Sequence, residues 1–234
     1  MKPTVVRTIP RPRPGLCEAL AGLGVATVHE AYNQRGLMDV RVKPIGLGHS
    51  VCGPAITALN HPGDNMMIHA ALATCRPGDV LVATTKSPSL GVLLGENLAT
   101  CAAAQGAVGA VIDGAVRDTS QIRAIQFPVW SSAISANGAV RRTAGWVNIP
   151  LVCGGVTVHP GDLVVADDDG VVIVARDEAE AVLEAAQAKA DAEARTIKRY
   201  QAGELSIDIW NLHPILEEQN VRYVDSLDDI GSPA

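Results

Sequence analysis

Aromatic residues are scarce in this chain of 234 residues, which has one Phe, three Trp and three Tyr. Hydrophobic residues still make up 47% of the sequence, so we expect a packed core built mainly from Val, Ala, Leu and Ile, and a largely disordered chain is excluded. No apolar run reaches the ~18–20 residues that a membrane-spanning helix needs. The nearest candidate, Cys101 to Ile112, is interrupted by Gln105. The sequence therefore predicts no membrane partner.

An excess of positive charge is also missing, since 19 Lys and Arg face 25 Asp and Glu for a net charge of −6. This balance argues against a nucleic-acid-binding surface, although a small anionic substrate needs only a local positive site. Residues 1–14 hold four prolines and three arginines but no hydrophobic signal-peptide core. The five cysteines are widely spaced and form no CxxC pair, which is typical of reduced thiols. We therefore expect a cytoplasmic protein that does not bind nucleic acid.

The common catalytic signatures are absent as well. The sequence contains no GxGxxG, P-loop, GxSxG or HExxH motif. The six histidines are scattered, and no two of them have the spacing of metal ligands on one helix. Asp167 to Gly170 is similar to a calcium-binding loop but lacks the alternating ligands and the final Glu, so we expect a polar turn between two strands.

The chain between Pro77 and Ala175 alternates short Val- and Ile-rich runs with helical segments, which is typical of an α/β sheet buried on both faces. Helices are predicted at 97–105 and 118–125, and strands at 107–112, 128–131 and 171–175. Two similar stretches, Pro77–Ala83 and Pro160–Ala166, each read as a turn that leads into a buried strand. We therefore expect a sheet in which two strands are each preceded by the same kind of turn.

The composition changes after residue 176. Asp177 and Glu180 have the spacing of a capping box, and a long helix is predicted from there to about Tyr200, followed by a small helical tail at 205–220. The predicted domains are therefore a core with an N-terminal arm over 1–176 and a C-terminal helical extension over 177–234. A helix of some 23 residues is ~35 Å long, more than one face of a small sheet needs. Packing of its far end on a neighbouring subunit is expected, and a helix folded back on its own domain is the alternative.

Two loops carry the one group of residues whose types and spacing indicate a chemical function. Gly91 to Leu98 leads into a helix whose first N–H groups can bind a carboxylate, and Arg117 and Asp118 follow a predicted strand. Ligands of open α/β sheets gather at the carboxyl ends of strands, so Glu96, Arg117 and Asp118 are expected at one rim. Arg117 offers a charged fork for a 2-oxo acid, and Asp118 can hold a hard divalent cation. From spacing alone, a surface ion pair or a helix cap is favoured over a catalytic role for the Arg-Asp pair.

The sequence as a whole resembles the class II pyruvate aldolases that cleave 4-hydroxy-4-methyl-2-oxoglutarate and 4-carboxy-4-hydroxy-2-oxoadipate, which are related to the RNase E regulator RraA. The likeness covers nearly all of residues 16–224. The matching stretches are Gly24–Ala31, Gly63–Met66, Pro77–Asp79, Gly95–Thr100, Ile112–Asp118, Phe127–Trp130, Pro160–Asp162, Ala166–Val171 and Ala202–Asp208.

This resemblance implies a swivelling α/β/β/α domain that assembles into a homotrimer or homohexamer. It implies that the backbone amides of the loop Gly95–Leu98 bind the substrate and that Arg117 contacts the 2-oxo group and carboxylate of pyruvate. Asp118 would be the protein ligand of Mg²⁺ or Mn²⁺, and Glu193 of an adjacent subunit would orient metal-bound water. The implied reaction is retro-aldol cleavage of a 4-hydroxy-2-oxo acid to pyruvate, with oxaloacetate decarboxylation as a side activity, in the breakdown of aromatic compounds.

The loop departs from the family at two positions. Glu96 stands where these aldolases usually have Asp, and Asn97 where they have an apolar residue. Glu96 keeps the charge but reaches one methylene further, so it can still hold metal-bound water. The identity of the substrate is therefore less well specified than the class of reaction.

Two readings from other functional classes stay open. A non-catalytic regulator that binds a ribonuclease, like RraA, would share the core but lack the helical extension from about Asp177 to Tyr223. A cofactor-binding or methyltransferase role would require a nucleotide loop, which the sequence does not contain. Release of pyruvate in the presence of Mg²⁺ distinguishes the aldolase from the regulator.

Overall fold

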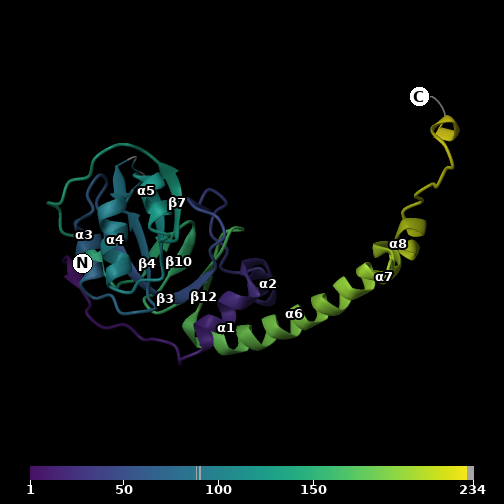
Figure 1. The fold of residues 1–234 in the computed structure, drawn as a ribbon, viewed down its shortest axis with the longest axis horizontal. Coiled ribbons are helices and arrows are strands. Elements are labelled where there is room, and N and C mark those ends of the chain that lie inside the picture. The colour runs from purple at the N-terminus through teal and green to yellow at the C-terminus, as the bar shows by residue number, and fades with distance from the viewer. Residues whose placement is uncertain (88, 90, 231–234) are drawn as a thin grey trace. The chain divides into compact units, whose positions relative to one another are not determined.

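The computed structural model describes residues 1–87, 89 and 91–230 (Figure 1). The chain divides into two compact units, Met1–Lys189 and Ala190–Ala234. The division falls inside helix α6 (Ala179–Gln201). Among the described residues, no helix combines the length and the apolarity that crossing a membrane requires.

Ten strands of the described chain form one mixed sheet in the first unit. Its main path runs β1-β8-β3-β4-β6-β7-β2, while β5 pairs with β6, and β11 pairs with both β3 and β12. A separate hairpin joins β9 and β10. The strands are β1 Thr4–Val5, β2 Lys43–Pro44, β3 Val51–Asn60, β4 Val80–Thr85, β5 Val92–Leu94, β6 Gly109–Val116, β7 Val129–Ile134, β8 Trp146–Val147, β9 Leu151–Cys153, β10 Val156–Val158, β11 Leu163–Ala166 and β12 Val171–Val174.

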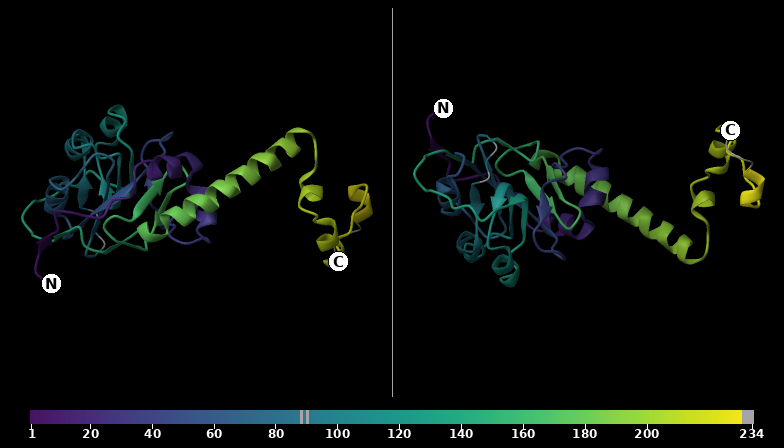
Figure 2. Two further views of the ribbon diagram at one scale, coloured as in Figure 1. Left: turned by 90° about the horizontal axis from the view of Figure 1, so that it is seen from below. Right: turned by 90° about the horizontal axis from the view of Figure 1, so that it is seen from above.

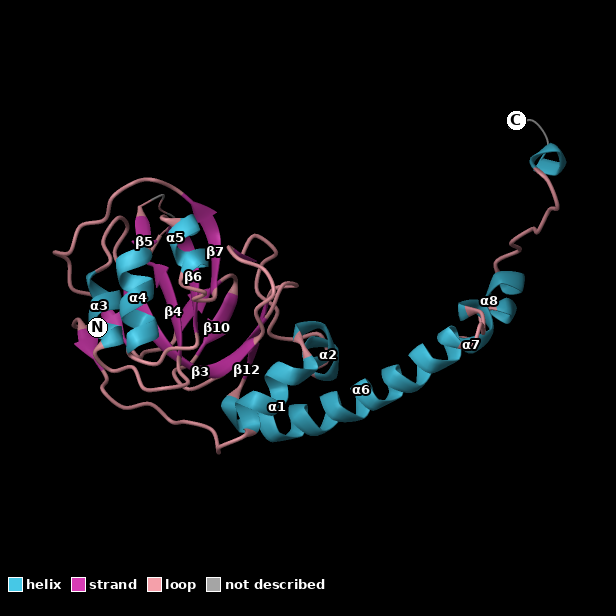
Figure 3. Ribbon diagram, viewed as in Figure 1, coloured by secondary structure: helices cyan, strands magenta, loops and turns pink. Residues whose placement is uncertain are grey.

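The centre of the sheet is parallel, as the alternating pattern predicts. Strands β3, β4, β6 and β7 pair in parallel, and the connections between them carry the helices. The helices of the first unit are α1 Leu16–Leu23, α2 Val25–Ala31, α3 Met66–Leu72, α4 Glu96–Ala104, α5 Thr119–Ala124 and the first part of α6. Helices α3, α4 and α5 lie side by side along one face of the sheet (Figures 2 and 3). The prediction of an α/β core is confirmed.

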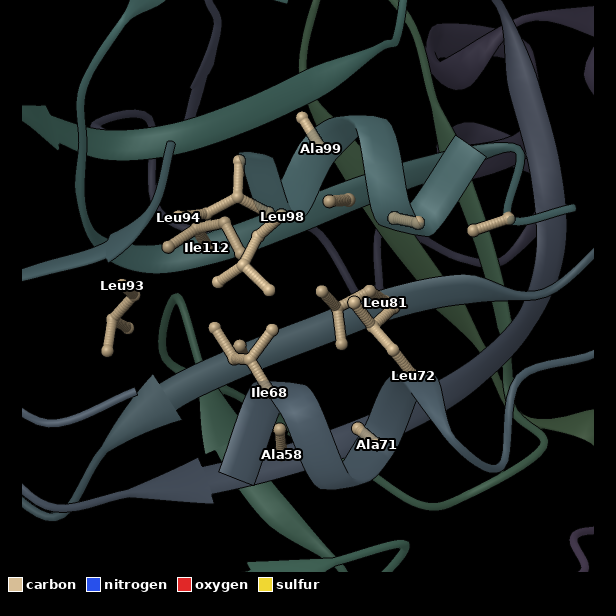
Figure 4. Packing of buried hydrophobic residues seen from close by; sticks show 14 of the residues in the cluster. Ala58, Ile68, Ala71, Leu72, Leu81, Leu93, Leu94, Leu98, Ala99 and Ile112 are labelled. Carbon is tan, nitrogen blue, oxygen red and sulfur yellow. The ribbon is translucent and has the colours of Figure 1, made fainter. Parts of the chain in front are cut away.

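Three clusters of buried apolar residues pack the layers of helices and strands against one another. Leu81 and Ile112 face α3 and α4, where they pack against Ile68 and Leu98 (Figure 4). Alternate residues of the same strands face the opposite way, so that Val82 joins a second cluster with β9 to β12. A third cluster covers the outer side of β11 and β12 with α1, α2 and the start of α6. This succession of helices, two strand layers and helices confirms the expected α/β/β/α arrangement.

The strand predicted at 107–112 is longer than expected. Strand β6 runs from Gly109 to Val116, because pairing with β5 and β7 continues past Ile112 with a shift of register between Ile112 and Ala115. Asp113 and Gly114, which the prediction places beyond the end of the strand, therefore lie inside it. As a result, Arg117 follows the last residue of β6 directly.

The expected capping box is not formed. Helix α6 is preceded by a short 3₁₀ turn at Arg176–Glu178, and the Asp177 carboxylate accepts a hydrogen bond from the Arg176 side chain. Glu180 instead forms a bidentate pair with Arg13 of the N-terminal arm. A partner distant in sequence thus outcompetes the local cap.

The two similar turn-to-strand stretches are structurally equivalent, as predicted. Asp79 accepts a hydrogen bond from the Arg76 N–H and Asp162 accepts one from the His159 N–H, each at 2.8 Å. The strands that follow, β4 and β11, both pair with β3. The two carboxylates differ in their second partner, because Arg11 donates to both oxygens of Asp79 at 3.1 and 2.7 Å, whereas Asp162 accepts from the Arg176 N–H.

The Arg11–Asp79 pair is expected to stabilise the fold measurably. The side chain of Asp79 is 0% exposed, and removing one partner of a buried ion pair typically costs about 3 kcal/mol or more. Asp79→Asn should therefore lower the free energy of unfolding, measured with urea, by about that amount. Glu180→Gln breaks the solvent-exposed pair with Arg13 and should leave the unfolding midpoint nearly unchanged. Equal losses in the two variants would contradict this ranking.

Candidate functional site

The two loops singled out in the sequence meet at the carboxyl ends of neighbouring parallel strands. Strand β5 leads through Gly95 into α4, and β6 leads through Arg117 and Asp118 into α5. The Arg117 N–H donates to the Leu94 carbonyl at 3.1 Å, so the two exits from the sheet are joined. The expectation that these loops share one rim is confirmed for the backbone.

Asp118 connects the two loops through its side chain. Its Oδ2 accepts a hydrogen bond from the Glu96 N–H at 3.2 Å and lies 3.4 Å from Nε of Arg117. The residue has a left-handed backbone conformation, with φ 54° and ψ 38°, and its side chain does not cap its own helix α5. The two structural interpretations of the Arg-Asp pair, a surface ion pair and a helix cap, are thus both partly correct. Asp118 pairs with Arg117, and it satisfies an N–H group at the start of α4, the helix across the rim.

Glycine is required at position 95 for this approach. A Cβ atom there would lie 2.7 Å from Oδ2 of Asp118 and 3.1 Å from Cγ of Arg117. Such contacts are too close for any side chain to be accommodated without moving both residues. Gly95 therefore allows the carboxylate and the guanidinium to lie directly against the loop.

A cavity of about 290 Å³ opens beside these groups. This volume is at the lower end of the range for small-molecule sites. Its lining comes from α3 and its cap residue, from β5 and α4, from the two residues that follow β6, and from the segment that connects β7 to β8. The lining residues are Asn65, His69, Val92, Gly95, Asn97, Leu98, Cys101, Arg117, Asp118, Gly138, Ala139 and Arg141.

Most of the residues predicted from the sequence lie at this cavity. Gly95, Asn97, Leu98, Arg117 and Asp118 all line it.

The remaining two predicted residues lie elsewhere. Glu96 contributes its backbone N–H to Asp118, but it is not among the described residues that line the cavity. Glu193 belongs to the second unit, so its contribution to a neighbouring subunit stays a prediction.

The cavity also contains three polar residues that sequence reasoning did not select. Asn65 and His69 come from the start and the last turn of α3, and Arg141 comes from the segment 135–145 between β7 and β8. In the sequence, Asn65 stands out only as part of the stretch Gly63–Met66 that matches the family. Arg141 lies in a segment whose hydrophobic residues follow no helix or strand period. No spacing rule brings these three residues next to Arg117, because they approach it from other connections of the sheet.

Asn65 presents an unsatisfied acceptor. The residue is 6% exposed, and its Nδ2 donates to the Leu93 carbonyl at 3.1 Å. Its Oδ1 is buried and has no hydrogen-bond partner in the described structure. A buried polar atom without a partner is costly, so a ligand that donates a hydrogen bond would be favoured here.

The electrostatic character of the cavity is positive. Two arginines, Arg117 and Arg141, line the cavity together with one carboxylate, that of Asp118. Partial burial, followed by the charge of Arg141, lowers the pKa of His69, so this imidazole is neutral at neutral pH. A protein with a net charge of −6 thus offers a local site for a small anion.

The side chains that could act as ligands limit the kind of metal ion that this site can hold. Among the described residues, no group of three or more His, Cys, Asp or Glu side chains lies close enough to hold a metal ion. Both hydrogen-bond and ion-pair contacts of the Asp118 side chain use Oδ2. One carboxylate of this kind fits a hard cation such as Mg²⁺, which keeps most of its water ligands in proteins.

Comparison with known proteins gives a family match over most of the first unit. The sequence model of the RraA-like family, described as "Aldolase/RraA", matches residues 18–173. A protein of Halalkalibacterium halodurans named "Putative 4-hydroxy-4-methyl-2-oxoglutarate aldolase" is 36% identical over 155 residues, which cover 66% of this chain and 74% of that protein.

Solved structures of RraA proteins have the same fold. RraAS2 of Streptomyces coelicolor, described as an unusual member of the RNase ES inhibitor RraA family, is similar with a TM-score of 0.72 and 30% identity over 81% of this chain and 100% of that chain. The RNA-processing inhibitor RraA from Thermus thermophilis is similar with a TM-score of 0.58 and 28% identity over 64% and 90% of the two chains.

The closeness of Arg141 to His69 can be tested by NMR titration. Arg141→Gln removes one of the two causes of the lowered pKa, so the pKa of His69 should rise but stay below its ordinary value, because partial burial remains. Arg141→Lys keeps the positive charge and should leave the titration of His69 nearly unchanged. An identical midpoint in the Gln variant and the original protein would show that Arg141 does not act on His69.

Proposed function

Because the chain belongs to the RraA-like family, we propose that it is a divalent-metal-dependent aldolase that releases pyruvate from a 4-hydroxy-2-oxo di- or tricarboxylate. The observation that carries this proposal is the contact of Arg117 and Asp118 with the loop at Gly95, beside a cavity that also holds Arg141. The candidate substrates are 4-carboxy-4-hydroxy-2-oxoadipate and 4-hydroxy-4-methyl-2-oxoglutarate. The latter is in the name of the relative from Halalkalibacterium halodurans.

The two guanidinium groups suit a substrate with carboxylates at both ends. The first N–H groups of α4 lack intrahelical acceptors, and with Arg117 they would bind the carboxylate and 2-oxo group of the pyruvate half. Arg141 would bind a carboxylate of the other half, next to the neutral His69. The unpartnered Oδ1 of Asn65 would accept a hydrogen bond from a substrate hydroxyl.

The proposed chemistry breaks the bond between C3 and C4. The electron pair of that bond passes to the pyruvate half as an enolate, and C4 becomes the carbonyl carbon of the second oxo acid. Arg117 stabilises the charge that develops on the C2 oxygen. Asp118 would hold Mg²⁺ or Mn²⁺, which when bound supplies Lewis-acid polarisation of the C2 carbonyl.

Proton transfer is assigned to Glu96 acting through water. A water held by Glu96 would accept the proton of the C4 hydroxyl and then return a proton to C3, which completes pyruvate. Glu96 is half-buried beside Gly95, one residue from the cavity lining, so its carboxylate needs this bridging water to reach the substrate. Loss of CO₂ from oxaloacetate produces the same enolate, so decarboxylation of oxaloacetate is proposed as a side activity.

A regulator that binds a ribonuclease is the second candidate. It is favoured by the similarity to the two RraA structures, of which one is described as a member of the RNase ES inhibitor RraA family and the other as an RNA-processing inhibitor. The match to the family model ends at residue 173, whereas helix α6 begins at Ala179, so the extension lies outside the family core. Together with the cationic cavity, this extension supports the aldolase over the regulator.

The aldolase proposal is tested by pyruvate release from both candidate substrates and from oxaloacetate, with Mg²⁺ or Mn²⁺ present. Arg117→Lys should reduce turnover by roughly 10²-fold, because an ammonium group cannot replace the planar fork. Asp118→Ala should abolish cation-dependent turnover. Arg123→Lys and Asp168→Ala, which change the same residue types away from the cavity, are the matched controls. Absence of pyruvate with all three compounds would refute the proposal.

The site is further proposed to be completed by Glu193 of an adjacent subunit in a closed homotrimer or homohexamer. The second unit leaves large apolar side chains exposed, which supports packing on another chain. They include Ile197, Leu205, Trp210, Ile215, Tyr223 and Leu227. A closed ring is expected because a head-to-tail contact otherwise polymerises.

Mixed oligomers test this shared site. Asp118→Ala and Glu193→Ala chains, each inactive alone, should regain part of the activity after dissociation and joint reassembly, since some hybrid sites then contain both residues. A mixture of Asp118→Ala and Arg117→Ala chains is the control, and it should stay inactive because one subunit supplies both residues. Equal recovery in the two mixtures, or none in verified hybrids of the first, would count against a shared site.

A further inference from the structure

Asp64 is a buried carboxylate that does not itself line the cavity. It lies at the end of the β3–α3 connection, next to Asn65, and is 2% exposed. Oδ1 accepts a hydrogen bond from the Met66 N–H, and Oδ2 accepts from the N–H groups of Arg142 and Thr143, all at 2.8 Å. One side chain thus links the start of α3 to the segment that carries Arg141.

Backbone hydrogen bonds join the same two segments. The Val140 N–H donates to the Gly63 carbonyl at 2.9 Å, and the Asn65 N–H donates to the Val140 carbonyl at 3.1 Å. These bonds hold the N-terminal side of Arg141, while the Asp64 carboxylate holds the two residues that follow it. Arg141 is therefore fixed from both sides, even though its own side chain is exposed.

The charge of Asp64 is suited to this task. Burial opposes ionisation, but the hydrogen bonds from the backbone N–H groups of Met66, Arg142 and Thr143 outweigh it and lower the pKa of the carboxyl. The group is therefore an ionised acceptor at neutral pH. An amide in its place has one acceptor oxygen, and its NH₂ group would face N–H donors.

We propose that Asp64 is a positioning residue that holds Arg141 at the cavity and thereby sets the affinity for the second carboxylate of the substrate. The inference rests on the proposed function, in which Arg141 binds that carboxylate and Arg117 binds the pyruvate half. Asp64 touches neither half. Its loss should therefore weaken the binding of dicarboxylates while leaving the pyruvate half of the site intact.

The test compares Asp64→Asn with Asp162→Asn. Asp162 is also buried and accepts hydrogen bonds from the backbone N–H groups of His159 and Arg176, but it lies outside the cavity lining. Hydrogen–deuterium exchange at the amides of Arg142 and Thr143 should accelerate by about tenfold or more in Asp64→Asn alone.

Ligand binding is measured by calorimetry with two probes, 2-oxoglutarate as an uncleaved dicarboxylate and pyruvate as a monocarboxylate. Asp64→Asn should weaken binding of 2-oxoglutarate by about fivefold, which is the range of an exposed charge pair, and leave pyruvate binding unchanged. In the cleavage assay, KM should rise while kcat and the exchange of pyruvate methyl protons with solvent stay constant. Adding Arg141→Gln to Asp64→Asn should weaken 2-oxoglutarate binding little further, since both changes remove the same contact.

The outcomes separate this inference from the aldolase proposal. If no substrate is cleaved but 2-oxoglutarate alone loses affinity in Asp64→Asn, the aldolase proposal fails and the positioning role stands. Unchanged amide exchange at Arg142 and Thr143 overturns the positioning role. Equal losses for 2-oxoglutarate and pyruvate also overturn it, because Asp64 would then support the fold of the whole site.

Discussion

The candidate site depends on the parallel pairing of β5 and β6, which brings two strand exits to the same edge of the sheet. The Arg117 N–H bonds to the Leu94 carbonyl, and the Asp118 carboxylate accepts the Glu96 N–H. This contact is possible only because Gly95 has no side chain. The positive start of α4, the guanidinium and the carboxylate therefore occupy one small region, and the cavity forms beside it.

The rest of the cavity is contributed by parts of the chain far from that contact. Helix α3 supplies Asn65 and His69, and the connection between β7 and β8 supplies Arg141. These two parts are joined through the buried carboxylate of Asp64, just as the two strand exits are joined through Asp118. The cavity is thus assembled by carboxylates that accept backbone N–H groups from neighbouring connections. The same arrangement places two arginines at the cavity, which gives an acidic protein a site suited to anions.

The clusters of buried residues explain how the strands that lead to the site are held in position. Residues of β4 and β6 alternate between the layer of helices α3 to α5 and the second strand layer, so both faces of the parallel strands are covered. Asp79 and Asp162 tie the entries of β4 and β11 on either side of β3. The position of β6 is therefore determined by packing on both faces of the sheet.

The sequence by itself determined the α/β class, the equivalent turns at Asp79 and Asp162, and the meeting of the Glu96 loop with Arg117 and Asp118 at one rim. These follow from local periodicity, from turn chemistry and from the rule that parallel strands end at one edge. The sequence did not reveal that β6 continues through Asp113 and Gly114, since this extension depends on pairing with two neighbouring strands. It also did not reveal that Glu180 pairs with Arg13 instead of capping α6. The places of Asn65, His69 and Arg141 at the cavity were decided only by the tertiary structure, because contacts between separate connections of a sheet leave no periodic pattern in the chain.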